Sequence, residues 1–524
     1  MMSRLLTAAQ MQAADRRTIE ELGLPGVVLM ENAGAAVVAA IYSRMPSLQQ
    51  LRPVLILAGM GNNGGDGFVV ARRLLTDGIR VKVLLFGRMD QVSGDARIHG
   101  QVFLALGGEL VEMQNNGDME PFPTWLAHAS LVVDALFGTG LSRPINNLPA
   151  HAITMVNAAH VPVMAIDLPS GIDADSGRVL GCAIQAHWSV AIAAEKIGHR
   201  LHPGAAHCGE VILAPIGIPD RLINIPEHRV AINRPDDLVL PQRPVNSHKG
   251  HFGHLLILAG SMGKSGAAVL TAMGALRVGP GLVTVATPSA VLPQIAVQVP
   301  EAMTLALPDY DSDESPGINT LDTILSSGFH PRAMAIGPGL GNNRRWSVVL
   351  QELLTRMDDI PAVLDADALN LLVRNGVSSI ARLAGERKAP LVITPHPGEM
   401  SRLVGLSVDK IQSDRLEIAM RTAQEWKVWV VLKGAGTIIA TPAGQAWINT
   451  TGNPSLAVGG SGDLLTGIIA GLMTQGMAAE QACRYGVWLH GASADALASS
   501  RGGPIGILAR DLLPHLEAIH NQRP

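Results

Sequence analysis

Short apolar runs that end in glycine or in an acidic residue recur along the chain. Examples are PVLILAG, SLVVDALFG and VPVMAIDLPSG in the first half, and HLLILAGS, AVLDADAL and VWVVLKGAG in the second. A helix-like or loop segment follows each run, and this alternation is typical of parallel β-sheets covered by α-helices. The pattern therefore predicts an α/β fold, with polar residues just beyond the carboxyl ends of the strands, where open α/β sheets bind ligands.

One proline-rich stretch divides the chain into two predicted domains. With 524 residues, of which 47% are hydrophobic, the chain is too long for one ordinary core. Residues 223–250 are rich in proline and show no sustained hydrophobic period. We predict a first domain over residues 1–225, a linker over residues 226–240 and a second domain over residues 241–524. Because the motifs of the two halves differ, we interpret them as unrelated α/β domains.

Charge and cysteine content indicate which binding partners and which cellular compartment the protein has. The formal net charge is -4 and no block of lysine and arginine occurs, so nothing favours a nucleic acid or an anionic membrane as partner. Three scattered cysteines argue against a disulfide framework and suit a reducing cytoplasm. No uninterrupted apolar run reaches about 18 residues. The N-terminal segment has the pattern of a helix capped by Thr7 and Gln10 rather than of a signal peptide. We expect a cytoplasmic protein.

The stretch PVLILAGMGNNGGDGF carries a glycine pattern found in nucleotide-binding proteins. An apolar run leads into Gly59, Gly61 and Gly64, which match G-x-G-x-x-G, and a segment of helical period follows. A dinucleotide site also requires an acidic residue at the end of the next strand, yet RVKVLLFGR ends without one. The loop carries instead the polar side chains of NNGGD. We therefore expect a nucleotide-related pocket with a chemistry of its own.

The stretch TTGNPSLAVGGSGDLLTGIIAGLM is the most informative in the second half. Residues 459–462 are small, and Asp463 follows them at the start of an apolar helix that we expect to begin near Leu464. Glycines at a helix N-terminus expose backbone N–H groups beside the positive end of the helix dipole, where they stabilise a phosphoryl group in transfer. Asp463 could take a proton from a substrate hydroxyl, or it could only satisfy backbone donors of the first turn.

Three other loops indicate the same kind of pocket. KGAGT, Lys433–Thr437, offers backbone amides and a cation to phosphates. GPGLG, Gly337–Gly341, lets a ligand approach the backbone closely, or is a plain tight turn. TPHPGE, Thr394–Glu399, fixes His396 between two prolines. GSMGKSG is not a P-loop, because Leu258 stands where that motif requires glycine.

The motifs of both halves resemble known families. GGSGD resembles the signature of ribokinase-like kinases, and with HKGHFGHLLILAGS, GPGLG, DADALN, TPHPGEM and KGAGT it is similar to the ADP-dependent NAD(P)H-hydrate dehydratase branch of that superfamily. The opening glycine stretch, LMENAG, DALFGTGLSR and DLPSGIDADSG resemble the NAD(P)H-hydrate epimerase domain. Together they cover almost the whole chain and resemble the bifunctional NAD(P)H-hydrate repair enzymes. The resemblance implies an N-terminal Rossmann-like three-layer α/β/α domain and a C-terminal ribokinase-like α/β domain.

The resemblance also implies a reaction. Reduced nicotinamide cofactors add water across a ring double bond and give R and S hydrates. The second domain would dehydrate the S form with ADP as phosphoryl donor, releasing AMP and phosphate, with Mg²⁺ accompanying ADP. The first domain would interconvert the R and S forms and bind K⁺. The implied partners are NADH hydrate, NADPH hydrate and ADP, with no nucleic acid or membrane, and paired domains of this kind often form a homo-oligomer.

In the second domain, the resemblance assigns site residues by position. Asp463 would activate the substrate hydroxyl. Contacts with the hydrate would come from Ala268, Gly339, His396 and Asp463, and contacts with the nucleotide from Lys433, Gly434, Ala435, Gly436, Thr437 and Gly462.

In the first domain, the resemblance makes Asp167 a substrate contact that acts as acid or base. Asp134 and Asp167 could instead be strand-end caps. Potassium would be held by the oxygen donors of Asn63, Asp134 and Ser170, which suit a hard cation. The hydrate would also be bound by Asn62, Asn63, Gly64, Gly65, Asp66, Gly138, Thr139, Gly140, Leu141, Ser142, Arg143 and Pro144.

The sequence leaves two other functions open. A ribokinase-like small-molecule kinase with a regulatory nucleotide-binding first domain would use Asp463 and its glycines equally well, although TPHPGEM and the first-half motifs fit it poorly. The first half could also be a non-catalytic nucleotide-binding or scaffold module. Accumulation of a stable phosphorylated product would favour the first alternative, and absence of R-to-S interconversion the second.

Overall fold

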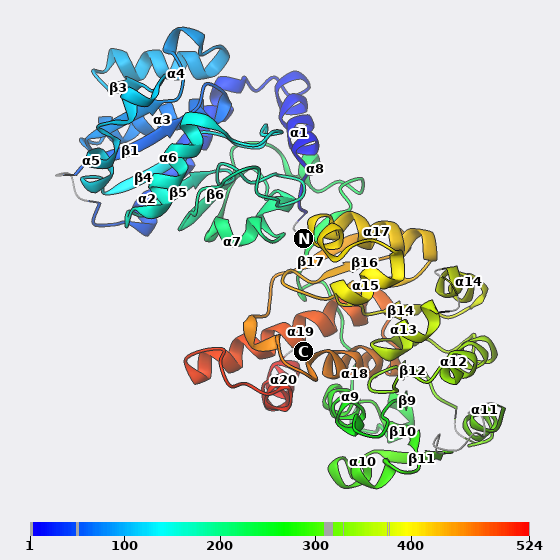
Figure 1. Ribbon diagram of the computed structural model, residues 1–524. Helices are drawn as coiled ribbons and strands as arrows, with labels where there is room; N and C mark the ends of the chain where they lie inside the picture. Colours follow the sequence, from blue (N-terminus) through cyan, green and yellow to red (C-terminus); the bar gives the residue numbers. More distant parts are fainter. Residues whose placement is uncertain are drawn as a thin grey trace. The chain divides into compact units, whose positions relative to one another are not determined.

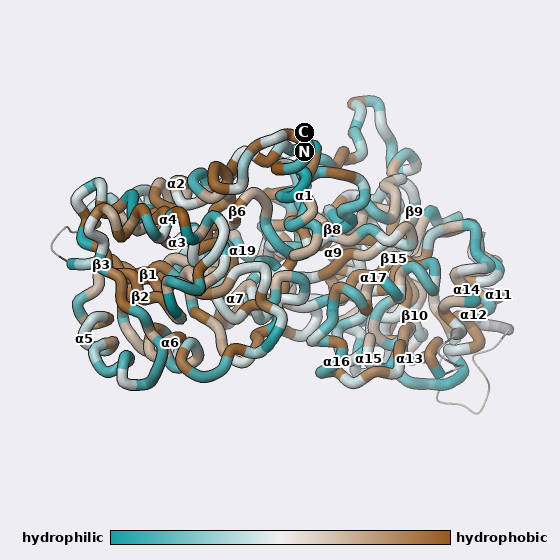
Figure 2. Tube along the Cα trace, turned by 90° about the horizontal axis from the view of Figure 1, so that it is seen from above, coloured by the Kyte–Doolittle hydropathy of each residue, from teal (hydrophilic) through white to brown (hydrophobic). Residues whose placement is uncertain are grey.

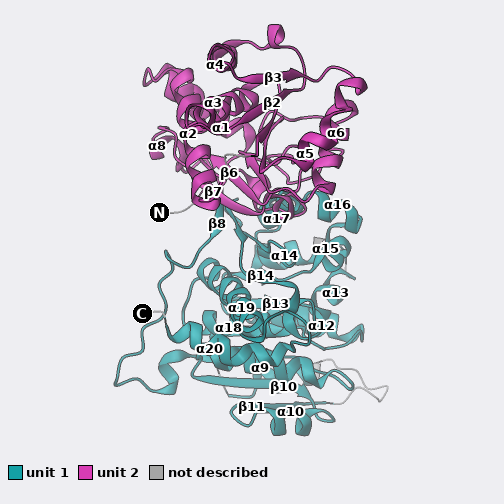
Figure 3. Ribbon diagram, turned by 90° about the vertical axis from the view of Figure 1, so that its left-hand side faces the viewer, with its two compact units in different colours: residues 1–2, 231–524 teal, residues 3–230 magenta. Residues whose placement is uncertain are grey.

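The chain divides between Val230 and Ala231 into two units, which Figure 3 draws in magenta and teal. The computed structural model describes residues 4–48, 52–308, 318–328, 330–374, 376 and 378–522 (Figure 1). The division falls inside the predicted linker, and part of that segment forms strand β8 (Val230–Asn233). The bounds predicted for the two domains stay a prediction.

Seven strands of the first unit form one sheet in which every neighbouring pair is parallel. The order is β3-β2-β1-β4-β5-β6-β7. From β1 the chain runs outward to β3, then returns to β4 on the other side of β1, and open α/β sheets bind ligands where the strand order reverses in this way. The strands are β1 (Val54–Ala58), β2 (Val81–Leu85), β3 (Glu109–Glu112), β4 (Leu131–Ala135), β5 (Val163–Ile166), β6 (Trp188–Ile192) and β7 (Glu210–Ala214).

The helices of the first unit cover both faces of this sheet. They are α1 (Ala8–Glu20), α2 (Gly26–Arg44), α3 (Asn62–Thr76), α4 (Gly94–Ala105), α5 (Phe122–Ala127), α6 (Asn147–Ala158), α7 (Gly204–Cys208) and α8 (Asp220–Ile223), with the 3₁₀ turns η1 (Met89–Gln91), η2 (Asn116–Met119) and η3 (Ile197–His199). Val54 and Ile56 of β1 pack with α2, α3 and α4, whereas Leu55 and Leu57 pack with α5 and α6. Because successive strand residues point to opposite faces, the apolar β1 serves two cores (Figure 2). The predicted three-layer α/β/α architecture is confirmed.

Helices α1 and α2 test the predicted N-terminal cap and the predicted absence of a long apolar segment. The capping box of Thr7 and Gln10 is present at the start of α1, as predicted. Among the described residues, α2 is long and apolar enough to cross a membrane by length and composition alone. Val37 and Ile41 of α2 are nevertheless fully buried in the core of the first sheet, so its apolar side is occupied by packing.

Ten strands of the second unit form a mixed sheet in the order β11-β10-β9-β12-β13-β14-β15-β16-β17-β8. Neighbours from β11 to β15 are parallel, and β15, β16 and β17 pair antiparallel. The parallel part aligns the carboxyl ends of its strands at one edge. The strands after β8 are β9 (His254–Leu258), β10 (Leu282–Pro288), β11 (Met303–Leu307), β12 (Ala333–Ile336), β13 (Ala362–Leu364), β14 (Leu391–Ile393), β15 (Trp429–Leu432), β16 (Ile438–Ala440) and β17 (Ala446–Asn449).

Helices of the second unit connect these strands. They are α9 (Ser265–Val278), α10 (Leu292–Gln298), α11 (Ile318–Leu325), α12 (Arg345–Arg356), α13 (Asp367–Val373), α14 (Ser378–Glu386), α15 (Pro397–Val404), α16 (Val408–Ser413), α17 (Arg415–Trp426), α18 (Ser461–Thr474), α19 (Ala479–Arg501) and α20 (Leu512–Asn521), with η4 (Lys249–Phe252), η5 (Pro454–Leu456) and η6 (Ala509–Asp511). Helix α18 begins at Ser461, three residues before the predicted start near Leu464, because Gly460 at φ +90° provides the turn into the helix. Asp463 therefore lies in the first turn.

The closest packing in the second unit joins α9 and α18. A Cβ on Gly467 would lie 2.0 Å from the backbone oxygen of Thr271, and one on Gly471 would lie 2.7 Å from a methyl carbon of Val278. Small residues thus bring the two helix backbones together, and their remaining side chains share one buried core with α19 and α20. This packing fixes the N-terminus of α18 against the sheet.

We expect Gly467→Ala to destabilise the second unit by roughly 1–3 kcal/mol, because the added methyl forces the two backbones apart. Denaturant unfolding followed by circular dichroism measures the loss. Gly385→Ala is the matched control, because Gly385 lies in α14 with open space around its Cβ position. Equal stability of the two variants would contradict the packing argument.

Candidate active sites

Gly59 and Gly64, which follow β1, are required by close packing of the loop itself. A Cβ on Gly64 would lie 1.9 Å from the backbone oxygen of Gly59, and one on Gly59 would lie 2.1 Å from that of Leu136. Backbone segments after β1 and β4 therefore touch at the point where the strand order reverses. These contacts account for Gly59 and Gly64 of the G-x-G-x-x-G pattern, whereas Gly61 has open space around its Cβ position. The missing acidic residue after β2 is consistent with a site other than an ordinary dinucleotide site.

Asp134, at the end of β4, is a fully buried carboxylate held by hydrogen bonds. Its oxygens accept from the N–H and Oγ of Ser170, at 2.7 and 2.6 Å, and from the N–H of Leu136 at 3.3 Å. Burial raises the pKa of Asp134 to about 6 against the opposing effect of these bonds. Among the ion pairs between described residues, none includes Asp134. A buried carboxylate without a cationic side chain is a place where a bound cation would be stabilising.

Asn63 lies beside the same turn. Its side-chain nitrogen is buried and has no hydrogen-bond partner in the described part of the chain. A Cβ on Gly138 would lie 3.1 Å from Asn63 Oδ1, and the preceding residue, Phe137, donates its N–H to Ser170 Oγ at 2.9 Å. The three residues predicted to hold potassium thus gather around the turn after β4. The predicted loop Gly138–Pro144 continues from this turn, and Gly140, Ser142, Arg143 and Pro144 are exposed.

Asp167 follows β5 and has an unusual backbone conformation, with φ +64° in a residue other than glycine. Lys196 Nζ lies 2.5 Å from Asp167 Oδ1, and the N–H of Ile192 donates to the same oxygen at 3.1 Å. His199 Nε2 lies 2.9 Å from the backbone oxygen of Asp167. Sequence reasoning missed Lys196 and His199. Their position after the carboxyl end of β6, the strand next to β5, was the available signal.

Asp66, in the first turns of α3, shares the electrostatic environment of Asp167. Burial raises the pKa of Asp66 well above its usual value, and the negative charges of Asp167 and Asp15 raise it further, whereas Lys196 lowers it. One carboxyl group of the pocket is therefore disposed to be neutral beside another that is paired with a cation. Such a separation of two carboxyl groups is the arrangement that supplies one acid and one base.

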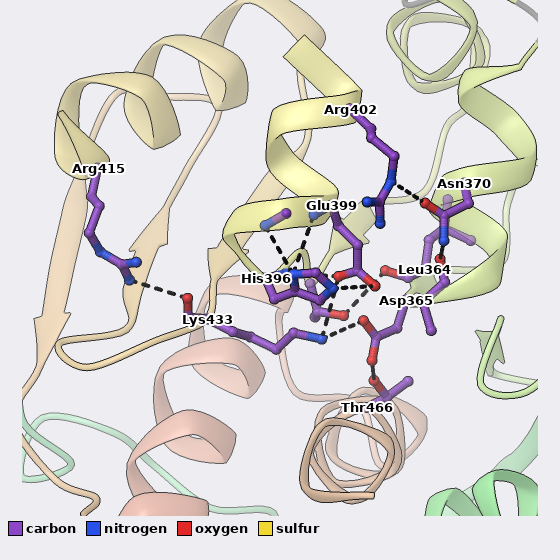
Figure 4. Close-up of polar contacts among 12 residues, drawn as sticks. Leu364, Asp365, Asn370, His396, Glu399, Arg402, Arg415, Lys433 and Thr466 are labelled. Carbon is purple, nitrogen blue, oxygen red and sulfur yellow. Dashed lines mark hydrogen bonds and ion pairs between the residues drawn. The ribbon is translucent and has the colours of Figure 1, made fainter. Parts of the chain in front are cut away.

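The second unit carries a network around Asp365, which follows β13 and is 1% exposed (Figure 4). Lys433 Nζ lies 2.6 Å from Asp365 Oδ1, and Thr466 Oγ1 of α18 donates to Asp365 Oδ2 at 2.7 Å. Lys433 is also 3.9 Å from a carboxylate oxygen of Glu399. Burial by itself would lower the pKa of Lys433, but the carboxylates of Asp365, Glu399 and Asp463 raise it above its usual value. The lysine is therefore a fixed cation.

Asp463 projects from the first turn of α18 beside this network. Burial raises its pKa to about 6, with Asp365 and Asp367 adding to the increase and Lys433 opposing it. A Cβ on Gly462 would lie 3.2 Å from Lys433 Nζ, so the glycine permits the helix N-terminus to approach the lysine. A carboxylate, an ammonium and the backbone N–H groups of a helix N-terminus therefore meet at one edge of the sheet, an arrangement that suits phosphoryl transfer to a hydroxyl.

Other predicted residues of the second unit have local roles. His396 is the N-cap of α15: its Nδ1 accepts from the N–H groups of Gly398 and Glu399 at 3.0 and 3.3 Å. Gly339, at φ +65°, packs against the backbone of Lys264, since a Cβ would lie 2.7 Å from that oxygen. In the KGAGT turn, Thr437 Oγ1 donates to the backbone oxygen of Gly434 at 2.9 Å, and Ala435 and Gly436 lie between them.

Ala268 is the predicted residue that the described structure does not bring to the site surface. Its side chain is fully buried in α9, and a Cβ on Gly260 would lie 3.2 Å from it. Sequence reasoning also gave no role to Asp365, Glu399 or Thr466, although DADALN and TPHPGEM contain the first two. Thr466 lies in an apolar helix, and no sequence signal distinguishes it from a core residue.

Backbone strain marks the loop after β13. Ala366 has φ +50° and ψ -118°, a conformation that residues with a Cβ rarely adopt. It stands between Asp365 and Asp367, and Asp367 Oδ2 accepts from Lys264 Nζ at 3.1 Å and from the N–H of Gly341 at 2.8 Å. The strained residue therefore directs two neighbouring carboxylates to two different cations. Strain of this kind concentrates at functional sites.

Comparisons with known proteins found relatives of both units. Residues 255–517 match the family described as NAD(P)H-hydrate dehydratase, and residues 26–198 match the family described as YjeF-related protein N-terminus. The bifunctional NAD(P)H-hydrate repair enzyme of Moorella thermoacetica is 44% identical over 98% of this chain and 96% of its own length. The protein of the same name from Thermofilum pendens is 36% identical over 94% of this chain and 92% of its own length. An ADP/ATP-dependent NAD(P)H-hydrate dehydratase from Bacillus subtilis, co-crystallised with ATP and Mg²⁺, is 35% identical over 54% of this chain and 94% of its own, with a TM-score of 0.47.

Fold and sequence similarity together define a two-domain α/β enzyme, with a reversal of strand order in the Rossmann-like sheet of the first unit and a glycine-rich helix start in the second unit. The similarity to the Moorella protein extends along nearly all of both chains. The chain belongs to the family of bifunctional NAD(P)H-hydrate repair enzymes.

We expect Asp463→Asn to stabilise the second unit at pH 7 by about 2 kcal/mol, since one pKa unit corresponds to about 1.4 kcal/mol and solvent screens part of the effect. The raised pKa means that ionisation of Asp463 opposes folding. In the unmodified protein, the loss of folding stability caused by ionised Asp463 is absent below about pH 4, grows as the pH rises and is complete above about pH 6. Denaturant unfolding at pH 4 and pH 7 measures it.

The matched control is Asp322→Asn, which changes an exposed aspartate of α11. We expect its effect on stability to be small at both pH values. A stabilisation by Asp463→Asn that is equal at pH 4 and pH 7 would contradict the assignment of a destabilising buried charge.

Proposed function

We propose that the second unit dehydrates the S form of hydrated NADH and NADPH with ADP as phosphoryl donor, releasing AMP and phosphate, and that the first unit interconverts the R and S forms. Hydroxide is a poor leaving group, whereas phosphate is a good one. Once the hydroxyl is phosphorylated, the lone pair of the ring nitrogen can expel it. The observation that carries the proposal is the meeting of Asp463, Lys433 and the N-terminus of α18 at one point.

In the dehydratase, Asp463 is the base that takes the proton from the substrate hydroxyl. Its pKa of about 6 leaves it ionised at neutral pH while keeping it basic enough to accept a proton. The N–H groups of Gly462 and of the turn Lys433–Thr437 bind the nucleotide phosphates, and Gly339 and His396 contact the hydrate. Ala268 supports the wall behind them. Asp365 and Thr466 hold Lys433 in place.

Magnesium would enter this site with the nucleotide. Within the described residues no group of three His, Cys, Asp or Glu side chains could hold a metal ion. This agrees with Mg²⁺ held mainly by phosphate oxygens and water, with one or two carboxylates in support, which is its ordinary mode in phosphoryl transfer. Glu399 and Asp367 are the carboxylates we assign to that support, and the ion supplies charge neutralisation of the phosphates.

In the epimerase, loss and return of the hydroxyl pass through a charged ring, so an acid and a base are needed. Asp167 is the carboxyl group that we assign as substrate contact and base. The NNGGD run, Asn62–Asp66, and the loop Gly138–Pro144 bind the hydrate. Potassium would be held by Asn63, Asp134 and Ser170. The buried side-chain nitrogen of Asn63, which has no hydrogen-bond partner among the described residues, supports this, since rotation of the amide would present its oxygen to a cation. We assign the protein to the cytoplasm, and its assembly as a homo-oligomer stays a prediction.

The decisive experiment gives the purified protein a mixture of the R and S hydrates of NADH and follows recovery of reduced-nicotinamide absorbance with ADP, ATP or no nucleotide. We expect full recovery with ADP, faster than spontaneous epimerisation permits. Asp463→Asn should lower the rate of dehydration by at least about 10²-fold, since a general base contributes that much, and should leave interconversion of R and S intact.

Asp167→Asn is the reciprocal variant. It should leave dehydration of the S form intact, so that recovery stops at the S fraction. Recovery that stops there in the unmodified protein would remove the epimerase assignment. Accumulation of a stable phosphorylated product, without recovery, would replace the dehydratase by a small-molecule kinase.

Potassium should raise the melting temperature of the first unit, because an ion that binds only the folded state stabilises it. We expect a higher melting temperature in KCl than in choline chloride at equal ionic strength. Asp134→Asn should abolish the difference. Asp90→Asn, which alters an exposed carboxylate paired with Arg88, should preserve it. A shift of equal size in all three proteins would show a general salt effect and contradict the site.

A further inference from the structure

Lys196 is a buried lysine to which the proposed reaction gives no role. It is 1% exposed, and its Nζ donates to Asp167 Oδ1 and, at 2.7 Å, to the backbone oxygen of Ile192. Taking an ammonium out of water costs several kcal/mol unless charge and hydrogen bonds compensate for it. A methionine would fill the same volume without that cost. Stability alone therefore gives no reason for a lysine at this position.

A closed set of hydrogen bonds links Lys196, His199 and Asp167. The N–H of Lys196 donates to His199 Nδ1 at 2.9 Å, so the ring proton is on Nε2, which donates to the backbone oxygen of Asp167. Burial lowers the pKa of His199, which keeps the ring neutral. These bonds hold Asp167 at φ +64°, a conformation that is unfavourable by roughly 1–2 kcal/mol for a residue with a Cβ.

The two carboxylate oxygens of Asp167 have different surroundings. Oδ1 accepts from Lys196 and from the N–H of Ile192. Among the hydrogen bonds between described residues, none engages Oδ2. We propose that Lys196 is a positioning residue of the epimerase, which anchors Asp167 through Oδ1 and presents Oδ2 as the oxygen that takes the proton of the attacking water. The inference rests on the proposed epimerase function of the first unit.

The reaction balances with two carboxyl groups. In the loss step the C–O bond breaks, the ring-nitrogen lone pair forms a C=N⁺ bond, and the oxygen leaves as water with the proton of the neutral carboxyl group of Asp66. In the return step water forms the new C–O bond on the other face, the electron pair returns to nitrogen, and Oδ2 of Asp167 takes the proton. Transfer of that proton to Asp66 through water restores the starting state.

The charges around Asp167 make Lys196 the cation that keeps the roles of Asp66 as acid and Asp167 as base apart. Asp15 from α1 and Asp66 from α3 are the nearby carboxyl groups, and burial raises the pKa of both while Lys196 lowers it. The other nearby charges, Glu195 and Arg200, are paired with each other. Without the charge of Lys196, three carboxyl groups would face one another with no cation among them, and a negative charge on the group would be less stable.

The test uses Lys196→Gln in the full chain, because glutamine keeps an N–H donor and removes the charge. The substrate is R-enriched NADH hydrate without ADP, and chromatography of the two hydrates follows interconversion. We expect kcat at pH 7 to fall about 10²-fold with little change in KM, since loss of a competent base has that magnitude. The rising limb of the pH–rate profile should move to higher pH. Lys196→Arg should keep the position of that limb.

Lys82→Gln is the matched control, because Lys82 pairs with Glu109 between β2 and β3, outside this group of residues. It should leave kcat and the pH profile unchanged. An unaltered pH profile in Lys196→Gln would overturn the proposal, whatever the fall in kcat. If Lys196→Gln does not fold, the test rests on Lys196→Arg, which keeps the positive charge. A rising limb of its pH–rate profile that moves to higher pH would overturn the proposal. Absence of interconversion in the unmodified protein would remove the epimerase function itself, which is a separate outcome.

Discussion

A buried aspartate paired with a lysine at the carboxyl end of a parallel sheet is the interaction on which both candidate sites depend. In the first unit the pair is Lys196 with Asp167, and in the second it is Lys433 with Asp365. Such a pair is stable only if the remaining hydrogen-bonding positions are filled, and removal of one partner is destabilising by about 3–5 kcal/mol because the other charge is left buried. Ile192 and Thr466 fill those positions. The sheet edge and the first turn of α18 are therefore fixed by electrostatics as well as by packing.

Each pair also determines the protonation of a second carboxyl group nearby. Burial raises the pKa of Asp66 in one unit and of Asp463 in the other, and the paired lysine opposes the increase in both. The two units thus share one physical arrangement, a carboxyl group of raised pKa beside a lysine–aspartate pair, to which we assign different purposes under the proposed function. The destabilisation that these carboxyl groups cause is typical of active sites.

Glycine makes these approaches possible. At Gly462 a side chain would meet Lys433, and at Gly64 it would meet the backbone of Gly59. The first motif resembles a phosphate-binding helix start and the second a dinucleotide loop, yet the same constraint, a backbone that must come within contact distance of another group, explains both. A glycine pattern therefore indicates close approach before it indicates a ligand.

The sequence by itself determined the fold class, the two-part organisation and the carboxyl ends of strands as the places of chemistry. Apolar runs of strand length and their periodic neighbours are local properties. Asp463 was selected from the glycine-rich helix start before it, and Asp134 and Asp167 from the resemblance of their motifs to the epimerase domain. Only the tertiary structure revealed Lys196, His199, Asp365 and Thr466 as partners, because each lies far along the chain from the group it contacts or inside an apolar segment. It likewise placed Ala268 in the core and began α18 at Ser461, since burial and the turn at Gly460 depend on packing between elements. Protonation states followed last, because they depend on burial and on charges that the fold alone brings together.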